Sequence, residues 1–204
     1  MMYGKVNMEA GPEVFYQFLK NLAPVNKSEF MQSMAFFHTK TLKKGDVFIH
    51  HQEIARKAAF IVSGILRSYY ITDNGAEITY CFCTESRFST SFKSFISQTP
   101  SQYIMEASTD AELLIISYED LQYLYSTFPV WQQIGRIATE QEYMELEKFT
   151  SILQGENAIQ KYQRMLNEAP EIIQQVPVNH IASYLGVTRE TLSRIRKQVS
   201  AEIR

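Results

Sequence analysis

Polar side chains between residues 188 and 197 have the types that hydrogen bonding to DNA bases requires. Arginine presents a planar fork to O6 and N7 of guanine, glutamate accepts from N4 of cytosine, and hydroxyl groups bind bases or phosphates. Leu192, Ile195 and Val199 recur at helical spacing, which predicts a helix with one buried stripe. A solvated helix whose charges only keep the chain soluble is the alternative. The candidate DNA-binding residues are Thr188, Arg189, Glu190, Thr191, Ser193, Arg194, Arg196 and Lys197.

A second, shorter helix is expected just before this one. Apolar residues at 181, 182 and 185 form one helical face, and Pro177 stands where a helix can begin without losing a backbone donor. Gly186 permits the left-handed backbone of a tight turn, and Thr188 can cap the helix that follows. The segment therefore predicts two helices joined by a glycine turn.

The charge of the chain is unevenly distributed. The 20 basic and 22 acidic residues give a formal net charge of −2 and a pI near 6.1. From Pro177 to Arg204 there are five basic and two acidic residues, so this segment has a charge of +3 and the remainder −5. An acidic body with a basic end indicates a confined surface for a polyanion.

Short β-rich runs separated by turn residues extend from about Thr41 to Ser117. Residues 73–75, reading DNG, are the strongest hairpin signal and join residues 65–71 to 77–82. A KKGD turn at residues 43–46 precedes them. This pattern predicts a compact antiparallel barrel or roll.

Helices are expected on both sides of the roll. Residues 14–22 form an amphipathic pattern, and Ser28 is expected to cap a second helix. A short helix is expected around residues 121–125, and Pro129 can start a long one over about residues 130–153. That helix would be about 35 Å long.

The long helix has a wide apolar stripe, for which two interpretations stay open. One is a dimer seam, and the other is a helix packed only inside its own subunit. The candidate dimerisation residues are Ile134, Ile137, Ala138, Gln141 and Met144.

The run IASYLGVTRETLSRIRK resembles the recognition module of the cyclic-AMP receptor and fumarate-nitrate regulator (Crp/Fnr) superfamily of bacterial transcription factors. KKGD, FIVSGILR and DNGAE are similar to the β-roll of a cyclic-nucleotide-binding domain. The resemblance implies an α+β fold with an N-terminal antiparallel β-roll of jelly-roll type (double-stranded β-helix), a long dimerisation helix and a C-terminal helix-turn-helix domain. The corresponding domain bounds are residues 1–126, 127–154 and 155–204. By the resemblance, Arg189, Glu190 and Arg194 contact bases, while Thr188, Ser193 and Lys197 bind phosphates.

The nucleotide-binding members of this superfamily carry a glycine–glutamate pair and an arginine–hydroxyl pair for the ribose and the cyclic phosphate. In residues 88–107 of this chain both pairs are replaced, and Glu106 would repel a phosphate. We therefore predict no tight binding of cyclic AMP. The roll either binds another small effector or is filled by its own aromatic residues. The candidate effector-pocket residues are Arg67, Phe88, Phe92, Lys93 and Tyr103.

The resemblance implies a mechanism and a set of partners. An event in the roll would repack the long helix about a hinge at Gly155 and change the spacing of two recognition helices across a two-fold axis. Helix 158–166, ended by Pro170, would support the recognition module. The implied partners are a partly palindromic double-stranded DNA operator, a second copy of the chain, RNA polymerase and a small-molecule effector of unknown identity. A sensing module that acts through protein contacts is the alternative function.

Enzymatic interpretations find little support. The histidines His38 and His180 have no evident acid or nucleophile partner, and no phosphate-binding glycine loop is present. Cys81 and Cys83 are separated by a single residue, whereas paired cysteines of a zinc site are usually separated by at least two. We expect no catalytic residue, metal or cofactor. Without a membrane span or signal peptide pattern, a cytoplasmic protein with no membrane partner is expected.

Overall fold

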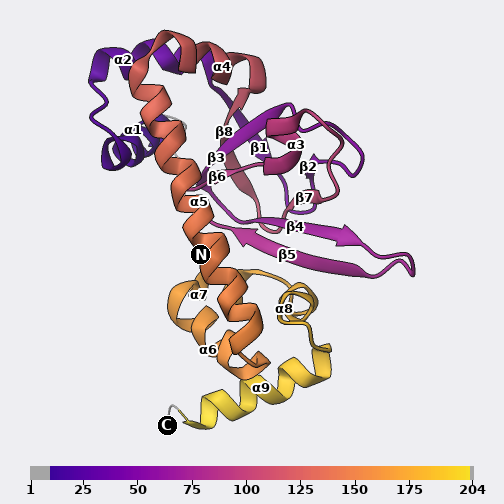
Figure 1. Cartoon of the computed structure of the whole chain (residues 1–204). Helices are drawn as coiled ribbons and strands as arrows, with labels where there is room; N and C mark the ends of the chain where they lie inside the picture. Colours follow the sequence, from indigo (N-terminus) through magenta and orange to yellow (C-terminus); the bar gives the residue numbers. More distant parts are fainter. Residues whose placement is uncertain (1–9, 203–204) are drawn as a thin grey trace.

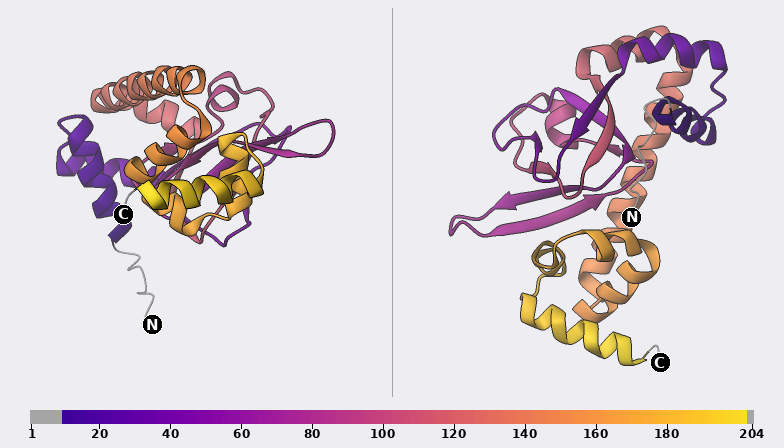
Figure 2. Two further views of the ribbon diagram at one scale, coloured as in Figure 1. Left: turned by 90° about the horizontal axis from the view of Figure 1, so that it is seen from below. Right: turned by 180° about the vertical axis from the view of Figure 1, so that it is seen from behind.

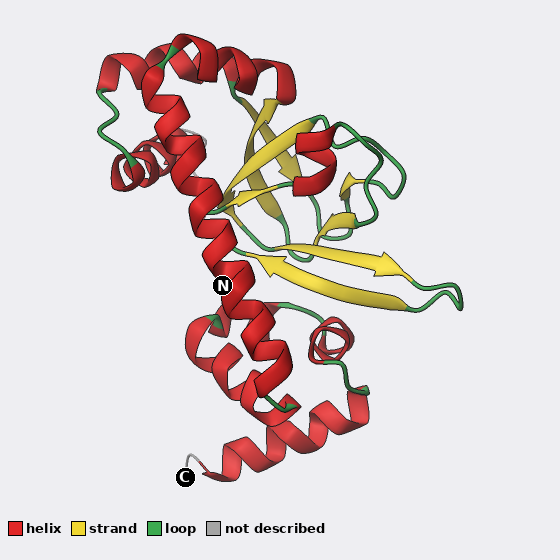
Figure 3. Cartoon of the chain, in the orientation of Figure 1, coloured by secondary structure: helices red, strands yellow, loops and turns green. Residues whose placement is uncertain are grey.

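A β-roll and a group of C-terminal helices are joined by one long helix in the computed structural model, which describes residues 10–202 (Figure 1). The helices that precede and follow the roll lie at the opposite end of the long helix from the C-terminal group (Figure 3). This arrangement confirms the predicted order of roll, long helix and C-terminal helices. No helix in residues 10–202 has the length and apolar character needed to cross a membrane.

Eight strands of the described residues form the roll as two antiparallel four-stranded sheets. One sheet has the order β1-β8-β3-β6, and the other has the order β2-β7-β4-β5. The predicted β-rich runs are all strands. The strands are β1 (His38–Leu42), β2 (Val47–Ile49), β3 (Lys57–Ser63), β4 (Leu66–Ile71), β5 (Glu77–Cys83), β6 (Phe88–Ser89), β7 (Ile104–Ala107) and β8 (Ala111–Ser117).

The long hairpin of β4 and β5 has the turn that the DNG signal predicts. Thr72 N–H donates to the carbonyl of Ala76 across it at 2.9 Å, and Gly75 has a φ of +82°. The register of the two strands shifts once, because Ser68 pairs with Cys81 but Tyr69 pairs with Thr79. The extra residue in β5 is therefore a β-bulge beside Cys81.

Aromatic side chains from the flanking helices complete the core of the roll. The ring of Phe15 lies 4.7 Å from that of Phe60 on β3 and 4.9 Å from that of Phe37. The first helices are α1 (Ala10–Leu22), α2 (Lys27–Ser33) and the short 3₁₀ helix η1 (Met34–Phe36). The expected cap of α2 is wrong: Asn26 accepts from Glu29 N–H in a capping box, and Ser28 lies inside the helix.

The helix α5 (Pro129–Gly155) divides into a packed half and an exposed half. Trp131 and Ile134 are buried in the core of the roll, and Gly135 allows the close approach of Tyr125 from α4 (Tyr118–Thr127). Residues 141–148 are all exposed. The N-terminal half of the helix is therefore packed inside its own subunit. The exposed C-terminal half leaves the dimer seam open as a prediction.

Four C-terminal helices pack around a second hydrophobic core, to which Ile65 of the roll also contributes. Ile181, Leu185, Leu192 and Ile195 are among its buried residues. Pro170 both ends the expected helix and begins another, which the sequence did not lead us to expect. The helices are α6 (Ala158–Glu168), α7 (Pro170–Gln175), α8 (Val178–Leu185) and α9 (Arg189–Glu202).

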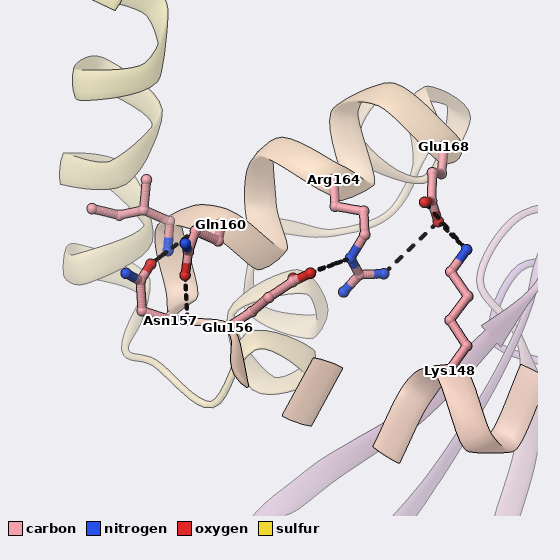
Figure 4. A network of polar contacts seen from close by, with 7 residues as sticks. Lys148, Glu156, Asn157, Gln160, Arg164 and Glu168 are labelled. Carbon is pink, nitrogen blue, oxygen red and sulfur yellow. Dashed lines mark hydrogen bonds and ion pairs between the residues drawn. The ribbon is translucent and has the colours of Figure 1, made fainter. Parts of the chain in front are cut away.

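The connection between α5 and α6 is held by polar contacts (Figure 4). Lys148 Nζ lies 3.1 Å from the carboxylate of Glu168, and Arg164 Nε lies 3.1 Å from that of Glu156. Asn157 caps α6 through a capping box. The chain turns at Glu156 and Asn157, whose backbones are extended, while Gly155 is the last residue of α5. A hinge at Gly155 stays a prediction.

Candidate nucleic-acid interface

The turn between α8 and α9 has the geometry that its glycine predicts. Gly186 is left-handed, with φ 69° and ψ 31°, and its N–H donates to the carbonyl of Ser183 at 3.1 Å. The N–H of Val187 reaches back to the carbonyl of Ala182 at 3.0 Å. These two bonds satisfy the free carbonyls at the end of α8 and fix the angle at which the chain leaves it.

The first turn of α9 is closed by its own side chains. Thr188 Oγ1 accepts from Thr191 N–H at 3.2 Å, so the predicted cap is confirmed. The pKa of Glu190 is lowered, first by a hydrogen bond from its own amide and then by the Thr188 hydroxyl. The carboxylate of Glu190 therefore lies at the helix N-terminus, where a negative charge is stabilised.

No other element covers the outer side of α9 (Figure 2). Arg189, Arg194 and Lys197 are exposed, and no carboxylate among the described side chains forms an ion pair with them. We call these three residues the basic face. Thr188, Glu190 and Ser193 are also exposed, and Thr191 is half-buried.

Arg196 differs from the other candidates. Its side chain is half-buried, and its Nε and Nη2 atoms are buried without a hydrogen-bond partner among the described residues. The cause is its position, because Arg196 follows the buried Leu192 by four residues and so flanks the buried stripe. Arg196 is thus less exposed than the other basic candidates of α9, and its contact with DNA stays a prediction.

The helix α8 packs on the β4–β5 hairpin and so joins the C-terminal helices to the roll. The hydroxyl of Ser183 accepts from Thr79 N–H at 2.9 Å and donates to the carbonyl of Glu77 at 2.8 Å. Tyr184 packs on Phe82 of β5, with ring centroids 5.5 Å apart. Strand β5 therefore contacts α8 through backbone and side chains alike.

Arg67 lies at the centre of this contact. Its side chain is 1% exposed, and its guanidinium bonds to Glu77 at 2.8 Å and to Glu106 at 3.0 Å. The same group approaches His180 Nε2 of α8 at 3.1 Å and donates to Thr79 Oγ1 at 2.9 Å. Both carboxylates neutralise the buried charge.

The contact fixes the protonation state of His180. Because a guanidinium can only donate, Nε2 is the acceptor and the proton lies on Nδ1. Burial first, and then the charge of Arg67, lower the pKa of His180. The sequence had suggested no partner for this histidine, and Arg67 is 113 residues away along the chain.

An open groove lies between the hairpin and the start of α9. Its volume is about 640 Å³. Glu77 and Ile78 line it from the roll, while Thr188, Arg189 and Thr191 line it from α9. The N-terminal end of the basic face is therefore next to the roll.

The five candidate effector-pocket residues are not brought together. Arg67 is neutralised at the contact with α8, and Phe88 packs on Phe15 and Phe60. Phe92 and Lys93 on the short helix α3 (Phe92–Ser97) are exposed. Tyr103 stacks on Tyr80, with ring centroids 4.9 Å apart. The prediction that these five residues line a single pocket is therefore wrong.

The segment that replaces the phosphate-binding residues satisfies its own polar groups. Ser101 donates to Ser91 at 2.8 Å, and Ser94 donates to the carbonyl of Thr99 at 2.5 Å. Ser94 also accepts from Ala55 N–H at 2.9 Å. These buried hydroxyls form hydrogen bonds inside the roll. They carry no positive charge that could pair with a phosphate.

The candidate dimerisation residues fall into two groups. Ile134 is 2% exposed in the core of its own subunit, so its assignment to a dimer seam is corrected. Ile137 and Ala138 are half-buried, and Gln141 and Met144 are exposed. A seam on α5 would therefore lie toward the C-terminal half of the helix.

Comparisons with known proteins agree with this architecture. Residues 39–128 match the family of the cyclic nucleotide-binding domain. No curated protein matches the chain. Three similar solved structures are the c-di-GMP-responsive global regulator CLP of Xanthomonas campestris, FixK2 of Bradyrhizobium japonicum and a Crp/Fnr-family transcriptional regulator of Eubacterium rectale.

The three likenesses extend over most of each chain. CLP is 21% identical with a TM-score of 0.68, covering 87% of this chain and 93% of its own. FixK2 is 19% identical with a TM-score of 0.66, covering 81% and 85%. The Eubacterium rectale protein is 20% identical with a TM-score of 0.64, covering 90% and 87%.

The roll thus has the fold of a cyclic nucleotide-binding domain, and a long helix and a helical C-terminal part follow it along the chain. The chain as a whole has the fold of the Crp/Fnr transcription regulators.

Proposed function

We propose that this chain is a transcription regulator that binds DNA sequence-specifically as a homodimer, with α9 in the major groove. The observation that supports this most directly is the basic face, since three cations without carboxylate partners among the described residues stand on an uncovered helix. Arg194 and Arg189 would contact base edges, and Lys197 and Ser193 would bind phosphates. Glu190 can accept from a cytosine once its contacts in the first turn are exchanged.

The exposed half of α5 supports the homodimer. Tyr143, Met144 and Leu146 are 70%, 58% and 48% exposed, so large apolar side chains of this half of the helix lie in solvent. A second copy packed on this surface would relate the two α9 helices by a two-fold axis. Half-sites about 34 Å apart, one turn of DNA, would then match them.

In this proposal the roll controls the position of α9. The contact between α8 and the β4–β5 hairpin is the route from the roll to the DNA-binding helices, and RNA polymerase is the expected partner on DNA. The effector, if a small molecule, is not a cyclic nucleotide bound through a phosphate cassette.

Selection of bound duplexes from random DNA tests the proposal. The wild type is expected to enrich a partly palindromic sequence, with an affinity that falls steeply with salt. Arg194→Ala should lose about 1–3 kcal/mol of discrimination at one base pair. Lys197→Ala should weaken all sequences alike and reduce the salt slope by about one. Lys27→Ala, an exposed cation on α2, is the control.

Equal retention of every duplex by the wild type would contradict the proposal. So would a loss of affinity in Lys27→Ala as large as that in Lys197→Ala, because binding would then reflect overall charge.

A further inference from the structure

Two cysteines stand side by side on β5, the strand that α8 packs on. Cys81 and Cys83 are alternate residues of the strand, so their side chains project from the same face. Both are free thiols, and both are half-buried. Between them, Phe82 projects from the opposite face and packs on Tyr184 of α8.

The two thiols project from the same face of β5 but are chemically unequal. The hydrogen bond from Cys81 lowers the pKa of Cys83 to about 7, the Ser89 hydroxyl and Arg87 act in the same direction, and burial opposes them. The same bond, followed by burial, raises the pKa of Cys81. Cys83 is therefore the more acidic thiol of the pair and is partly a thiolate at neutral pH, while Cys81 stays protonated.

We propose that Cys81 and Cys83 form a peroxide-reactive dithiol, in which Cys83 is the nucleophile and Cys81 resolves the product as a disulfide. A partly exposed thiolate beside a second thiol is the arrangement that favours reversible oxidation. The dithiol itself lies in the roll, and the proposal does not depend on DNA binding.

The chemistry balances with a hydroperoxide as the oxidant. The Cys83 thiolate attacks one peroxide oxygen, an S–O bond forms, the O–O bond breaks, and the alkoxide or hydroxide released takes up a proton. The Cys81 sulfur then attacks the sulfenic acid, an S–S bond forms and the S–O bond breaks. The hydroxyl leaves as water with the proton of Cys81. Two thiols are oxidised and one peroxide is reduced to an alcohol, or to water when the oxidant is hydrogen peroxide, and water.

The geometry of β5 makes this disulfide labile. Residues two apart in an antiparallel strand have Cα atoms about 6.8 Å apart, which is at the upper limit of about 6.8 Å for a disulfide. Closing the bond shortens the strand locally, and the bulge beside Cys81 is where β5 can yield. A strained disulfide is readily reduced, so the reaction is reversible.

Shortening β5 between the two cysteines moves Phe82 relative to α8. The ring of Phe82 contacts Tyr184, and three residues earlier Thr79 N–H donates to Ser183 of the same helix. Oxidation is therefore expected to loosen the contact between the roll and α8. Faster hydrogen exchange at the amides of α8 would report it directly.

Intact-mass and peptide mass spectrometry of the full chain, treated with hydrogen peroxide at neutral pH, test the proposal. The wild type should lose the mass of two hydrogen atoms in one peptide that holds both cysteines. Cys81→Ser should stop at a sulfenic acid on Cys83, which dimedone traps. Cys83→Ser should react about tenfold more slowly, because the remaining thiol is protonated. The double variant Cys81→Ser with Cys83→Ser is the blank.

A second measurement uses only the wild type, so its result does not depend on whether the variants fold. It compares the rates at which iodoacetamide alkylates the two cysteines. Cys83 should be modified faster than Cys81, with a pH midpoint near 7. Several outcomes would overturn the proposal: resistance of both thiols to peroxide, equal rates in Cys83→Ser and the wild type, or disulfides formed only between chains. Unchanged exchange of α8 after oxidation would overturn the link to the C-terminal helices.

Discussion

At the scale of single residues, the guanidinium of Arg67 joins two strands and one helix in a space that water barely reaches. It bonds to Glu77 and Glu106 from the roll and to His180 from α8. Its ring contact with Tyr69, at 4.1 Å from the centroid, covers one face of the group. The side chain of Glu106 is only 15% exposed. Removing Arg67 takes away the cation with which its carboxylate forms an ion pair.

We expect Arg67→Met to lower the free energy of unfolding by about 3–5 kcal/mol, because an uncompensated carboxylate stays buried. The double variant Arg67→Met with Glu106→Met should lose less than the sum of the single variants. Denaturant unfolding of the four proteins of the cycle measures both values. Lys43→Met, which removes the exposed ion pair with Asp110, should leave stability nearly unchanged, because solvent screens that pair. Strict additivity in the Arg67 cycle would contradict the contact.

His180 should make the stability of the chain depend on pH. A base whose pKa is lowered on folding binds fewer protons than it does in the unfolded chain, so stability rises with pH. The contribution is complete above the unfolded value of about 6.5 and is lost as the pH falls toward the lowered folded value. Unfolding measured from about pH 7.5 to about 5.5 should therefore show falling stability.

The variant His180→Gln should make this dependence shallower, since glutamine accepts from Arg67 without titrating. His38 is an exposed histidine on β1, so His38→Gln is the matched control. Equal slopes in His180→Gln and the wild type would show that another group causes the effect.

At the scale of elements, residues 88–107 form a segment of the roll whose buried polar groups are hydrogen-bonded within the roll. Its buried serines bond to one another and to the backbone, and its one cation, Lys93, points to solvent. Calorimetry with cyclic AMP and cyclic GMP should therefore detect no binding at micromolar concentration. Micromolar affinity for either nucleotide would mean that the roll rearranges to form a phosphate site.

The sequence was most informative for elements whose own residues determine them. Gly186 and Thr188 specify their turn and cap by local chemistry, and the DNG turn specifies its hairpin. The cap of α2 was misplaced, because Asn26 and Ser28 are both good caps and only the position of Glu29 distinguishes them. The helix after Pro170 was missed, because the same proline that ends α6 is also a good first residue for α7.

At the scale of the whole molecule, the sequence could not predict which surfaces meet. Apolar spacing indicates that a side chain is buried but not what covers it, so Ile134 was assigned to a dimer seam although the roll covers it. Arg67, Ser183 and His180 meet only because the C-terminal helices pack on the hairpin. No local pattern in the sequence marks such a contact.

Association of two chains through α5 gives a prediction at this scale. Met144→Glu should convert the proposed dimer to a monomer, because a charge would be buried in the apolar seam. Sedimentation velocity measures the change. Tyr123→Glu, which places a charge at a similarly exposed apolar position on α4, should leave association unchanged. A wild type that sediments as a monomer would contradict the seam.

The chain contains a single tryptophan, Trp131, and it lies in only one of the two hydrophobic cores. Its fluorescence therefore reports on the roll, while the C-terminal helices unfold without an intrinsic tryptophan signal. Circular dichroism in the far ultraviolet detects the loss of helices in both parts. If the two probes give different midpoints, the cores unfold as separate units, and the gap between the midpoints measures how strongly the roll holds the C-terminal helices.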